Sequence, residues 1–256
     1  MTRNQPIKGY NEEFIGEIVH HLIKNTHPEW HEMLGKALQT VDQTYLHQLE
    51  NNCDWLPGIH HLFAAFSLPL SETKYILLGE SPYPRSQSAN GYAFWDNTVQ
   101  KLWSETGLSK EVNRATSLRN WIKMMLVARG DLQEDCSQFA IAALDKSQYC
   151  QTAEQFFRSL IKKGFLLLNA SLVYSTDQVR YHARQWQPFM HSLLSQLGKN
   201  KQPLQLILFG RIAEQIPEAH FFPCLIAEHP YNLSFITNPK VLAFFKPLDL
   251  LNCHDI

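Results

Sequence analysis

The sequence predicts an α/β fold in which helices are layered against a mostly parallel sheet. Two observations predict it: four short runs are continuously apolar, and helical patterns separate them along the chain. A continuously apolar strand is typical of a parallel sheet that is covered on both faces, whereas a half-exposed strand alternates. Strands that alternate with helices favour a layered α/β domain over an all-α or all-β fold.

The four apolar runs are the predicted strands, at residues 75–78, 165–168, 206–209 and 224–227. Apolar residues at helical spacing predict helices at residues 12–23, 30–49, 59–66, 117–127, 152–161, 186–197 and 240–245. The segment 107–146 has no clear pattern, and we expect helices and a variable insertion there. No linker or repeat is visible, so residues 1–256 are expected to form a single domain with N-terminal helices over 1–70.

Composition and charge narrow the class of protein. Of the 256 residues, 45% are hydrophobic and 18% are charged, which suits a sizeable core and excludes a disordered chain. The 23 Lys and Arg nearly cancel the 24 Asp and Glu, and a formal net charge of −1 argues against a large footprint on phosphates. Backbone N–H groups and hydroxyls also hold phosphates, so DNA binding stays open.

The five cysteines are odd in number, widely spaced and without a C-x-x-C pair, which argues against a disulfide framework or a zinc site. No cofactor is expected. The first residues lack the apolar region of a signal peptide, and no apolar run approaches the ~20 residues that span a bilayer. We expect a cytoplasmic, monomeric protein without a membrane partner.

Polar side chains follow each predicted strand directly. The segments concerned, in chain order, are Gly79-Glu80-Ser81-Pro82-Tyr83, Asn169, Gly210-Arg211 and Glu228-His229-Pro230. In open α/β sheets, ligands bind beyond the carboxyl ends of the strands. We therefore expect the Ser, Tyr, Asn and His of these segments to converge on one site at the edge of the sheet.

Four segments, in order along the chain, resemble the motifs of family 1 uracil-DNA glycosylases. They are Gly-Glu-Ser-Pro-Tyr-Pro at 79–84, Asn-Gly-Tyr-Ala-Phe at 90–94, Leu-Leu-Leu-Asn at 166–169 and His-Pro-Tyr-Asn-Leu-Ser at 229–234. The resemblance covers roughly residues 28–247 and implies a three-layer α/β/α fold with a central four-stranded sheet. It also implies a DNA repair enzyme that flips uracil or a related pyrimidine out of single- or double-stranded DNA and hydrolyses its N-glycosidic bond.

The resemblance implies a role for each residue of the site. Phe94 would stack on the extruded base, the Asn169 amide would read its edge, and Tyr83 would exclude a thymine methyl group. His229 would donate a hydrogen bond to the anion that develops on O2 of the base. Glu80 occupies a position that offers its backbone N–H to the base.

Further residues would contact the DNA backbone. Leu233 would enter the space that the flipped nucleotide leaves in the base stack. Ser117 and Ser234 either contact phosphates, as the resemblance implies, or cap the helices that follow them. Tyr231 stands where the family has a serine that contacts phosphate, so the DNA path or the accepted base is expected to differ.

Ser81 departs most from the family pattern. The family's Gly-Gln-Asp-Pro-Tyr-His loop has an Asp there, which faces the sugar cation and orients the attacking water. A serine hydroxyl positions a water without a charge, and two unit charges ~4 Å apart interact by about 4 kcal/mol at an effective dielectric of 20. We expect weak activity, unless Glu80 supplies the missing carboxylate.

Two other interpretations stay open. The chain could be a catalytically impaired family member that binds DNA or a protein partner, which Ser81 favours. It could also be an unrelated α/β hydrolase with Ser81 as nucleophile, but no glycine follows at the position that a nucleophile elbow requires. Phe94, Asn169 and His229 favour the enzyme, because a scaffold has no chemical need for all three.

Overall fold

The computed structural model describes residues 20–52, 54–200 and 202–252. Its central sheet has four strands in the order β4-β1-β5-β6, and all three pairings are parallel. The strands are β1 (Tyr75–Gly79), β4 (Phe165–Asn169), β5 (Gln205–Phe209) and β6 (Cys224–Ala227). The four predicted strands are confirmed, each to within one residue at either end.

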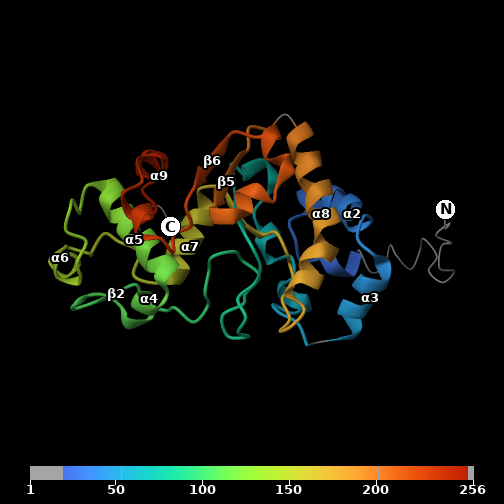
Figure 1. Ribbon diagram of the computed structural model, residues 1–256, viewed down its shortest axis with the longest axis horizontal. Helices are drawn as coiled ribbons and strands as arrows, with labels where there is room; N and C mark the ends of the chain where they lie inside the picture. The colour runs from blue at the N-terminus through green and yellow to red at the C-terminus, as the bar shows by residue number, and fades with distance from the viewer. Residues whose placement is uncertain (1–19, 53, 201, 253–256) are drawn as a thin grey trace.

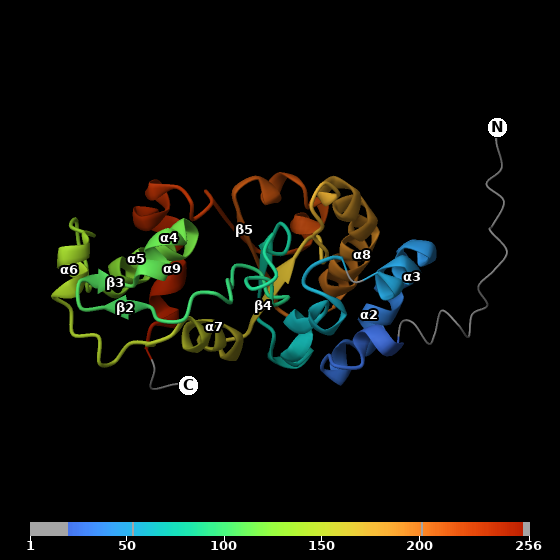
Figure 2. The ribbon, with the colours of Figure 1, turned by 90° about the horizontal axis from the view of Figure 1, so that it is seen from below.

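Helices cover both faces of the sheet, which confirms the three-layer fold (Figures 1 and 2). The helices on one side are α2 (His31–Leu38), α3 (Gln43–Asn51) and α8 (Val179–Lys199). Those on the other side are α5 (Thr116–Arg129), α7 (Ala153–Lys162) and α9 (Pro239–Phe245). Alternate residues of a strand point to opposite faces of the sheet and pack into different cores. Ile76 and Leu78 of β1 belong to one core and Leu77 to the other.

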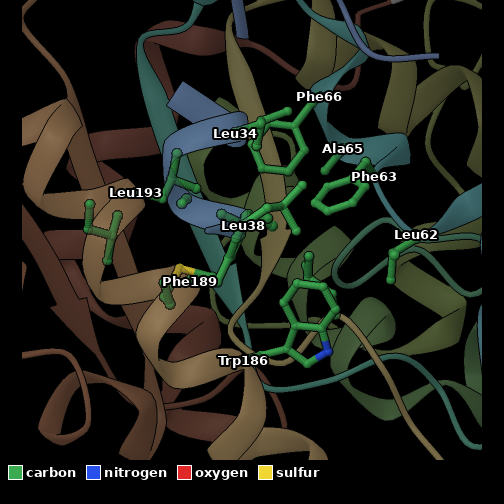
Figure 3. Packing of buried hydrophobic residues seen from close by; sticks show 14 of the residues in the cluster. Leu34, Leu38, Leu62, Phe63, Ala65, Phe66, Trp186, Phe189 and Leu193 are labelled. Carbon is green, nitrogen blue, oxygen red and sulfur yellow. The ribbon is translucent and has the colours of Figure 1, made fainter. Parts of the chain in front are cut away.

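The first core lies between the sheet and helices α2 and α8 (Figure 3). Leu34 and Leu38 of α2 meet Trp186, Phe189 and Leu193 of α8, and all five side chains are fully buried. Burial of such a side chain stabilises the fold by about 1.5–3 kcal/mol. This packing fixes α8 against the sheet.

The second core is rich in aromatic rings. Trp121 of α5 makes edge-on contacts with Phe94, Phe156, Phe209 and Phe245, at centroid distances of 5.7 to 6.3 Å. Such contacts add about 0.5–1.5 kcal/mol each beyond the burial of area. The second core therefore holds the loop after β1, which carries Phe94, against the sheet.

Two predicted helices are broken in the structure. Residues 30–49, predicted as one helix, belong to the 3-10 helix η1 (Pro28–Trp30), α2 and α3. The break occurs because Asp42 accepts a hydrogen bond from the Tyr45 N–H and so caps a new helix. Residues 59–66 form two 3-10 segments, η2 (Ile59–His61) and η3 (Ala64–Ser67), since the backbone at Phe63 is not helical.

Other parts match the predicted helices more loosely. The predicted helix 12–23 lies outside the described residues up to residue 19, and residues 20–23 are helical. The segment 107–146 holds α4 (Lys110–Arg114), α5 and α6 (Gln138–Ala142), as expected. A hairpin of β2 (Trp103–Ser104) and β3 (Gly107–Leu108) opens it, which the sequence did not indicate.

The remaining short 3-10 helices are η4 (Leu70–Glu72), η5 (Gly210–Glu214), η6 (Pro217–Phe221), η7 (Leu233–Thr237) and η8 (Lys246–Leu248). Two of them, η5 and η7, follow strand β5 and the loop after β6, at the edge of the sheet where the site is expected. None of the helices in the described residues has the length and apolarity to cross a membrane.

A buried polar network ties α3 to α8. His182 Nδ1 lies 2.8 Å from the Tyr45 hydroxyl, and its Nε2 lies 3.1 Å from Ser175 Oγ. Burial lowers the pKa of His182, which keeps the folded-state ring neutral. In the unfolded chain the ring has a pKa of about 6.5 and takes up a proton more readily.

The free energy of unfolding is therefore expected to fall as the pH decreases below about 6.5, as the unfolded state gains the proton. Urea unfolding of the wild type and of His182→Gln at pH 7.5 and pH 5.0 measures this. The loss of stability between the two pH values should be smaller in the variant. An equal loss in both proteins would show that His182 does not contribute.

Candidate active site

The loops after the strands enclose a pocket of about 270 Å³ at the carboxyl edge of the sheet. Seven of the ten predicted site residues line it: Glu80, Ser81, Tyr83, Phe94, Ser117, Asn169 and His229. The convergence predicted from the strand ends is thus what the structure shows. The other three, Tyr231, Leu233 and Ser234, lie on the segment that follows His229, outside this pocket.

Asn169 ends β4 directly beside Gly79, the last residue of β1. Its side chain is buried, and a Cβ added to Gly79 would lie only 2.5 Å from Asn169 Oδ1, so the glycine leaves the room that the amide occupies. Within the described residues no protein group hydrogen-bonds this amide. A buried amide favours a partner, so its acceptor and donors are available to a molecule that enters the pocket.

Phe94 forms an aromatic wall of the pocket. Its φ of 65° lies in the left-handed region, a conformation that costs a non-glycine residue about 1–3 kcal/mol. The edge-on contacts with Trp121 and Phe209 compensate for this cost. The ring lies at 27° to the imidazole of His229, with 5.9 Å between centroids, and both residues line the pocket.

Tyr83 forms a second wall. Its hydroxyl donates a hydrogen bond of 3.2 Å to the carbonyl oxygen of Phe94, which fixes the ring. Burial raises the pKa of Tyr83 to about 12, so the phenol is neutral at pH 7. The bulk of a fixed, uncharged ring restricts what fits beside it.

His229 follows β6 and is held by the loop that it begins. The Tyr231 N–H donates to His229 Nδ1 at 3.1 Å, which places the proton of the neutral ring on Nε2. Burial lowers the pKa of His229, and the negative charge of Glu80 opposes this shift. At pH 7 the ring therefore offers a neutral Nε2–H donor.

Asn120 of α5 anchors the same loop, although the sequence did not single it out. Its Nδ2 donates to the Pro230 carbonyl at 2.8 Å and lies 3.2 and 3.5 Å from the carbonyls of Tyr231 and Asn232. The side chain is fully buried. A polar residue between the apolar positions of an amphipathic helix was the available signal. The contacts of Asn120 set the course of the loop that follows His229.

Two large side chains project from this loop: Tyr231 is 67% exposed and Leu233 is 71% exposed. Exposed apolar groups of this size beside a pocket are suited to contact a partner. Tyr231 lines an adjoining hollow of about 560 Å³ together with Arg211 of η5, which is exposed. The sequence placed Arg211 after the third strand without assigning it a role.

Ser117 and Ser234 do not cap the helices that follow them, so the helix-cap alternative is wrong for both. Ala115 is the N-cap residue of α5, and Ser117 lies within its first turn and lines the pocket. Asn232 is the N-cap residue of η7, and Ser234 lies inside η7, where its hydroxyl helps to lower the pKa of Glu228. Ser117 lines the pocket, whereas Ser234 lies on the segment that follows His229.

Ser81 and Glu80 complete the pocket at the end of β1. Within the described residues, neither side chain has a hydrogen-bond or ion-pair partner, and Glu80 is the one carboxylate that lines the pocket. No group of three or more His, Cys, Asp or Glu in the described part of the chain could hold a metal ion. The polar groups of the pocket are thus one amide, one imidazole, hydroxyls and one carboxylate.

Comparison with known proteins adds a family context. No protein-family model matches the chain. It is 27% identical over 214 residues to the uracil-DNA glycosylase of Corynebacterium efficiens, covering 81% of this chain and 78% of that protein. It is 27% identical over 193 residues to that of Campylobacter jejuni, covering 73% and 71%.

Two solved structures are also similar. The UNG of Nitratifractor salsuginis is 41% identical, with a TM-score of 0.86 and coverage of 98% of this chain and 99% of that one. The mimivirus uracil-DNA glycosylase is 20% identical, with a TM-score of 0.54 and coverage of 89% and 77%, which shows the fold alone.

Proposed function

This chain belongs to the uracil-DNA glycosylase family, and from that premise we propose that it slowly hydrolyses the N-glycosidic bond of uracil, or of a related modified pyrimidine, in DNA. One observation carries the proposal: the Asn169 amide, which no group in the described part of the chain hydrogen-bonds, lies in a pocket together with the Phe94 ring and the Nε2–H of His229. These are the groups that recognise a pyrimidine and stabilise its anion. The proposed rate is low because Ser81 has no charge.

Recognition of the base would rest on three side chains. Uracil presents an N3–H donor beside an O4 acceptor, and the Asn169 amide has a matching acceptor and donor. Phe94 would stack on the extruded ring. Tyr83, fixed by its hydrogen bond to Phe94, would fill the space beside C5 and exclude the methyl group of thymine.

Bond cleavage would rest on His229 and on the groups that face the sugar. When the C1′–N1 bond breaks, its electron pair stays with the base and negative charge develops on O2. The neutral Nε2–H of His229 would donate to that oxygen, a contribution of typically ~3–4 kcal/mol. Ser81 would hold the attacking water, but its hydroxyl offers no charge to the sugar cation.

Contacts to the DNA strand would come from the rim of the pocket. Leu233 would fill the gap that the flipped nucleotide leaves, as apolar wedges do in other DNA-bending proteins. Ser117 and Ser234 would hydrogen-bond the phosphates on the two sides of the flipped nucleotide. Tyr231 is larger than a serine, and the exposed Arg211 beside it would supply the phosphate contact that Tyr231 does not.

Binding of free uracil tests the pocket without requiring turnover. Asn169→Asp is expected to weaken binding at least tenfold, since a carboxylate cannot donate and would repel O4. Calorimetric titration of both proteins with uracil measures this, with thymine as the control ligand. Equal uracil binding in both proteins, or none in either, would contradict the proposed pocket.

Asn120→Ala is expected to lower the free energy of unfolding by about 1–3 kcal/mol, because loop carbonyls lose their buried donor. The same change should weaken affinity for DNA with an abasic site, since Leu233 loses its fixed position. Urea unfolding and fluorescence anisotropy measure the two effects. Asn113→Ala, on α4, is the control for affinity. Wild-type affinity and stability in Asn120→Ala would show that the loop holds its shape without the anchor.

Ser81 also favours a second candidate, a family member that binds DNA or a protein partner and leaves the glycosidic bond intact. It predicts tight binding to uracil DNA without any product, however much enzyme is added. Restored cleavage in Ser81→Asp would be compatible with both candidates, so wild-type turnover decides between them.

A further inference from the structure

We propose that Glu80 supplies the carboxylate of this reaction: it faces the positive charge on the sugar and takes the proton of the water that Ser81 holds. The inference rests on the proposed function. It assigns the acidic role to the residue that precedes the position at which the family has its Asp.

The position of Glu80 suits this role. Its side chain is exposed and lines the 270 Å³ pocket as well as two adjoining hollows, of about 360 and 560 Å³. Ser81 lines the pocket and the 360 Å³ hollow. Glu80 therefore lies where the three spaces meet, and Ser81 lines two of them with it.

The backbone of Glu80 is fixed while its carboxylate is available. The Glu80 carbonyl accepts a hydrogen bond from the Ser171 N–H at 3.0 Å, and the Gly79 carbonyl accepts one from the Ala170 N–H at 2.8 Å. These bonds extend the pairing of β1 and β4 past the ends of both strands. No protein group in the described residues pairs with the carboxylate.

The charge of Glu80 already acts on the site. It raises the pKa of His229 against the effect of burial, so the carboxylate lies close enough to interact with the imidazole. A group that interacts with His229, and lines the pocket that His229 lines, is near the space for the sugar and the leaving base.

No other acidic side chain in the described residues is as well placed. Glu228 and Glu214 line the 560 Å³ hollow but not the pocket itself. Glu228 is also engaged, since it accepts from Asn238 Nδ2 at 2.7 Å. The basic groups of other elements that line a hollow together with Glu80 are Arg211 of η5, in the 560 Å³ hollow, and Arg184 of α8, in the 360 Å³ hollow.

The step balances as a hydrolysis. The C1′–N1 bond breaks and its electron pair leaves with the base, whose O2 accepts the hydrogen bond from His229. The water oxygen forms a bond to C1′, and the proton that the water loses goes to the Glu80 carboxylate. Before the water adds, the same carboxylate stabilises the sugar cation. An exposed carboxylate that no group in the described residues pairs with is less well oriented than one held inside the loop, in keeping with slow turnover.

Affinity for a charged sugar mimic tests the inference without turnover. The probe is a DNA strand with a cationic pyrrolidine in place of the abasic sugar, measured with free uracil present; the neutral probe carries a tetrahydrofuran instead. Glu80→Gln is expected to weaken binding of the cationic probe about tenfold or more and leave the neutral probe unchanged. The matched control, Glu214→Gln, should affect the two probes equally.

Turnover gives the second test. Glu80→Gln should lower the single-turnover rate of the wild type at least tenfold, but by less than about threefold in a Ser81→Asp background, where Asp supplies the charge. Equal loss of cationic-probe affinity in Glu80→Gln and Glu214→Gln, or no loss in either, would overturn the inference. If the wild type shows no turnover, the proposed function fails, and the probe affinities still decide the position of the Glu80 charge.

Discussion

Ser81→Asp is expected to raise the single-turnover rate of uracil excision about a hundredfold, because Glu80 already supplies about a tenfold share of the charge stabilisation. The added carboxylate would face the sugar cation at ~4 Å, an interaction of about 4 kcal/mol at an effective dielectric of 20, and 1.36 kcal/mol is tenfold in rate. Rapid quenching of the reaction on a uracil oligonucleotide, with enzyme in excess, measures the rate. Ser81→Asn is the matched control, since it has the same size as Asp and no charge.

Two outcomes would count against this account of Ser81. An equal gain in Ser81→Asn would attribute the effect to side-chain size rather than to charge. No gain in either variant would mean that the pocket lacks more than a carboxylate. In that case the binding candidate would be favoured over the enzyme.

His229→Ala is expected to lower the single-turnover rate about 100- to 1000-fold, because the leaving anion loses a preorganised donor. The effect is best measured in the Ser81→Asp background, where the higher rate leaves room for a loss. His220→Ala, which removes an exposed imidazole from η6, is the control. Since burial lowers the pKa of His229, the ring keeps its neutral Nε2–H donor at pH 7 and above, and the loss of rate in His229→Ala should be the same across neutral pH.

A rate in His229→Ala within threefold of its parent would contradict the assigned role. Free-uracil affinity separates this from a collapse of the pocket. It should change much less than the rate, because neutral uracil has no full charge on O2. A parallel loss of affinity and rate would instead assign His229 to shaping the pocket.

The sequence was sufficient to predict the strands of the sheet and the convergence of the site residues at its edge. Each strand is continuously apolar because it is covered on both sides, and that pattern alone gave its bounds to within one residue. Parallel strands all end at one edge, so Asn169 and His229 had to meet even though 60 residues separate them. The local apolar pattern and a general rule of sheet topology were together enough to predict the strands and the position of the site.

Features that depend on contacts between distant segments could not be predicted from the sequence. The amide of Asn120 serves carbonyls more than 100 residues away, and nothing near residue 120 indicates that partner. The split between α2 and α3 depends on the helix cap at Asp42. The apolar pattern continues across Asp42, so the sequence did not indicate the break. The presence of the Glu80 carboxylate in the same pocket as His229 likewise became visible only with the fold.

Some expectations stay predictions. The single domain over residues 1–256 includes segments outside the described residues, and the cytoplasmic location and monomeric state rest on the sequence. The roles of the site residues are proposals whose geometry the pocket supports. Their tests lie in the variants above.

The most direct test is a single-turnover assay of the wild-type protein on matched oligonucleotides that contain one uracil or one thymine, as single strands and as duplexes. The account predicts slow formation of an alkali-labile abasic site at the uracil alone, and none with Asn169→Asp. It would be contradicted if the wild type, in excess and over long incubation, bound the uracil strand and left every glycosidic bond intact.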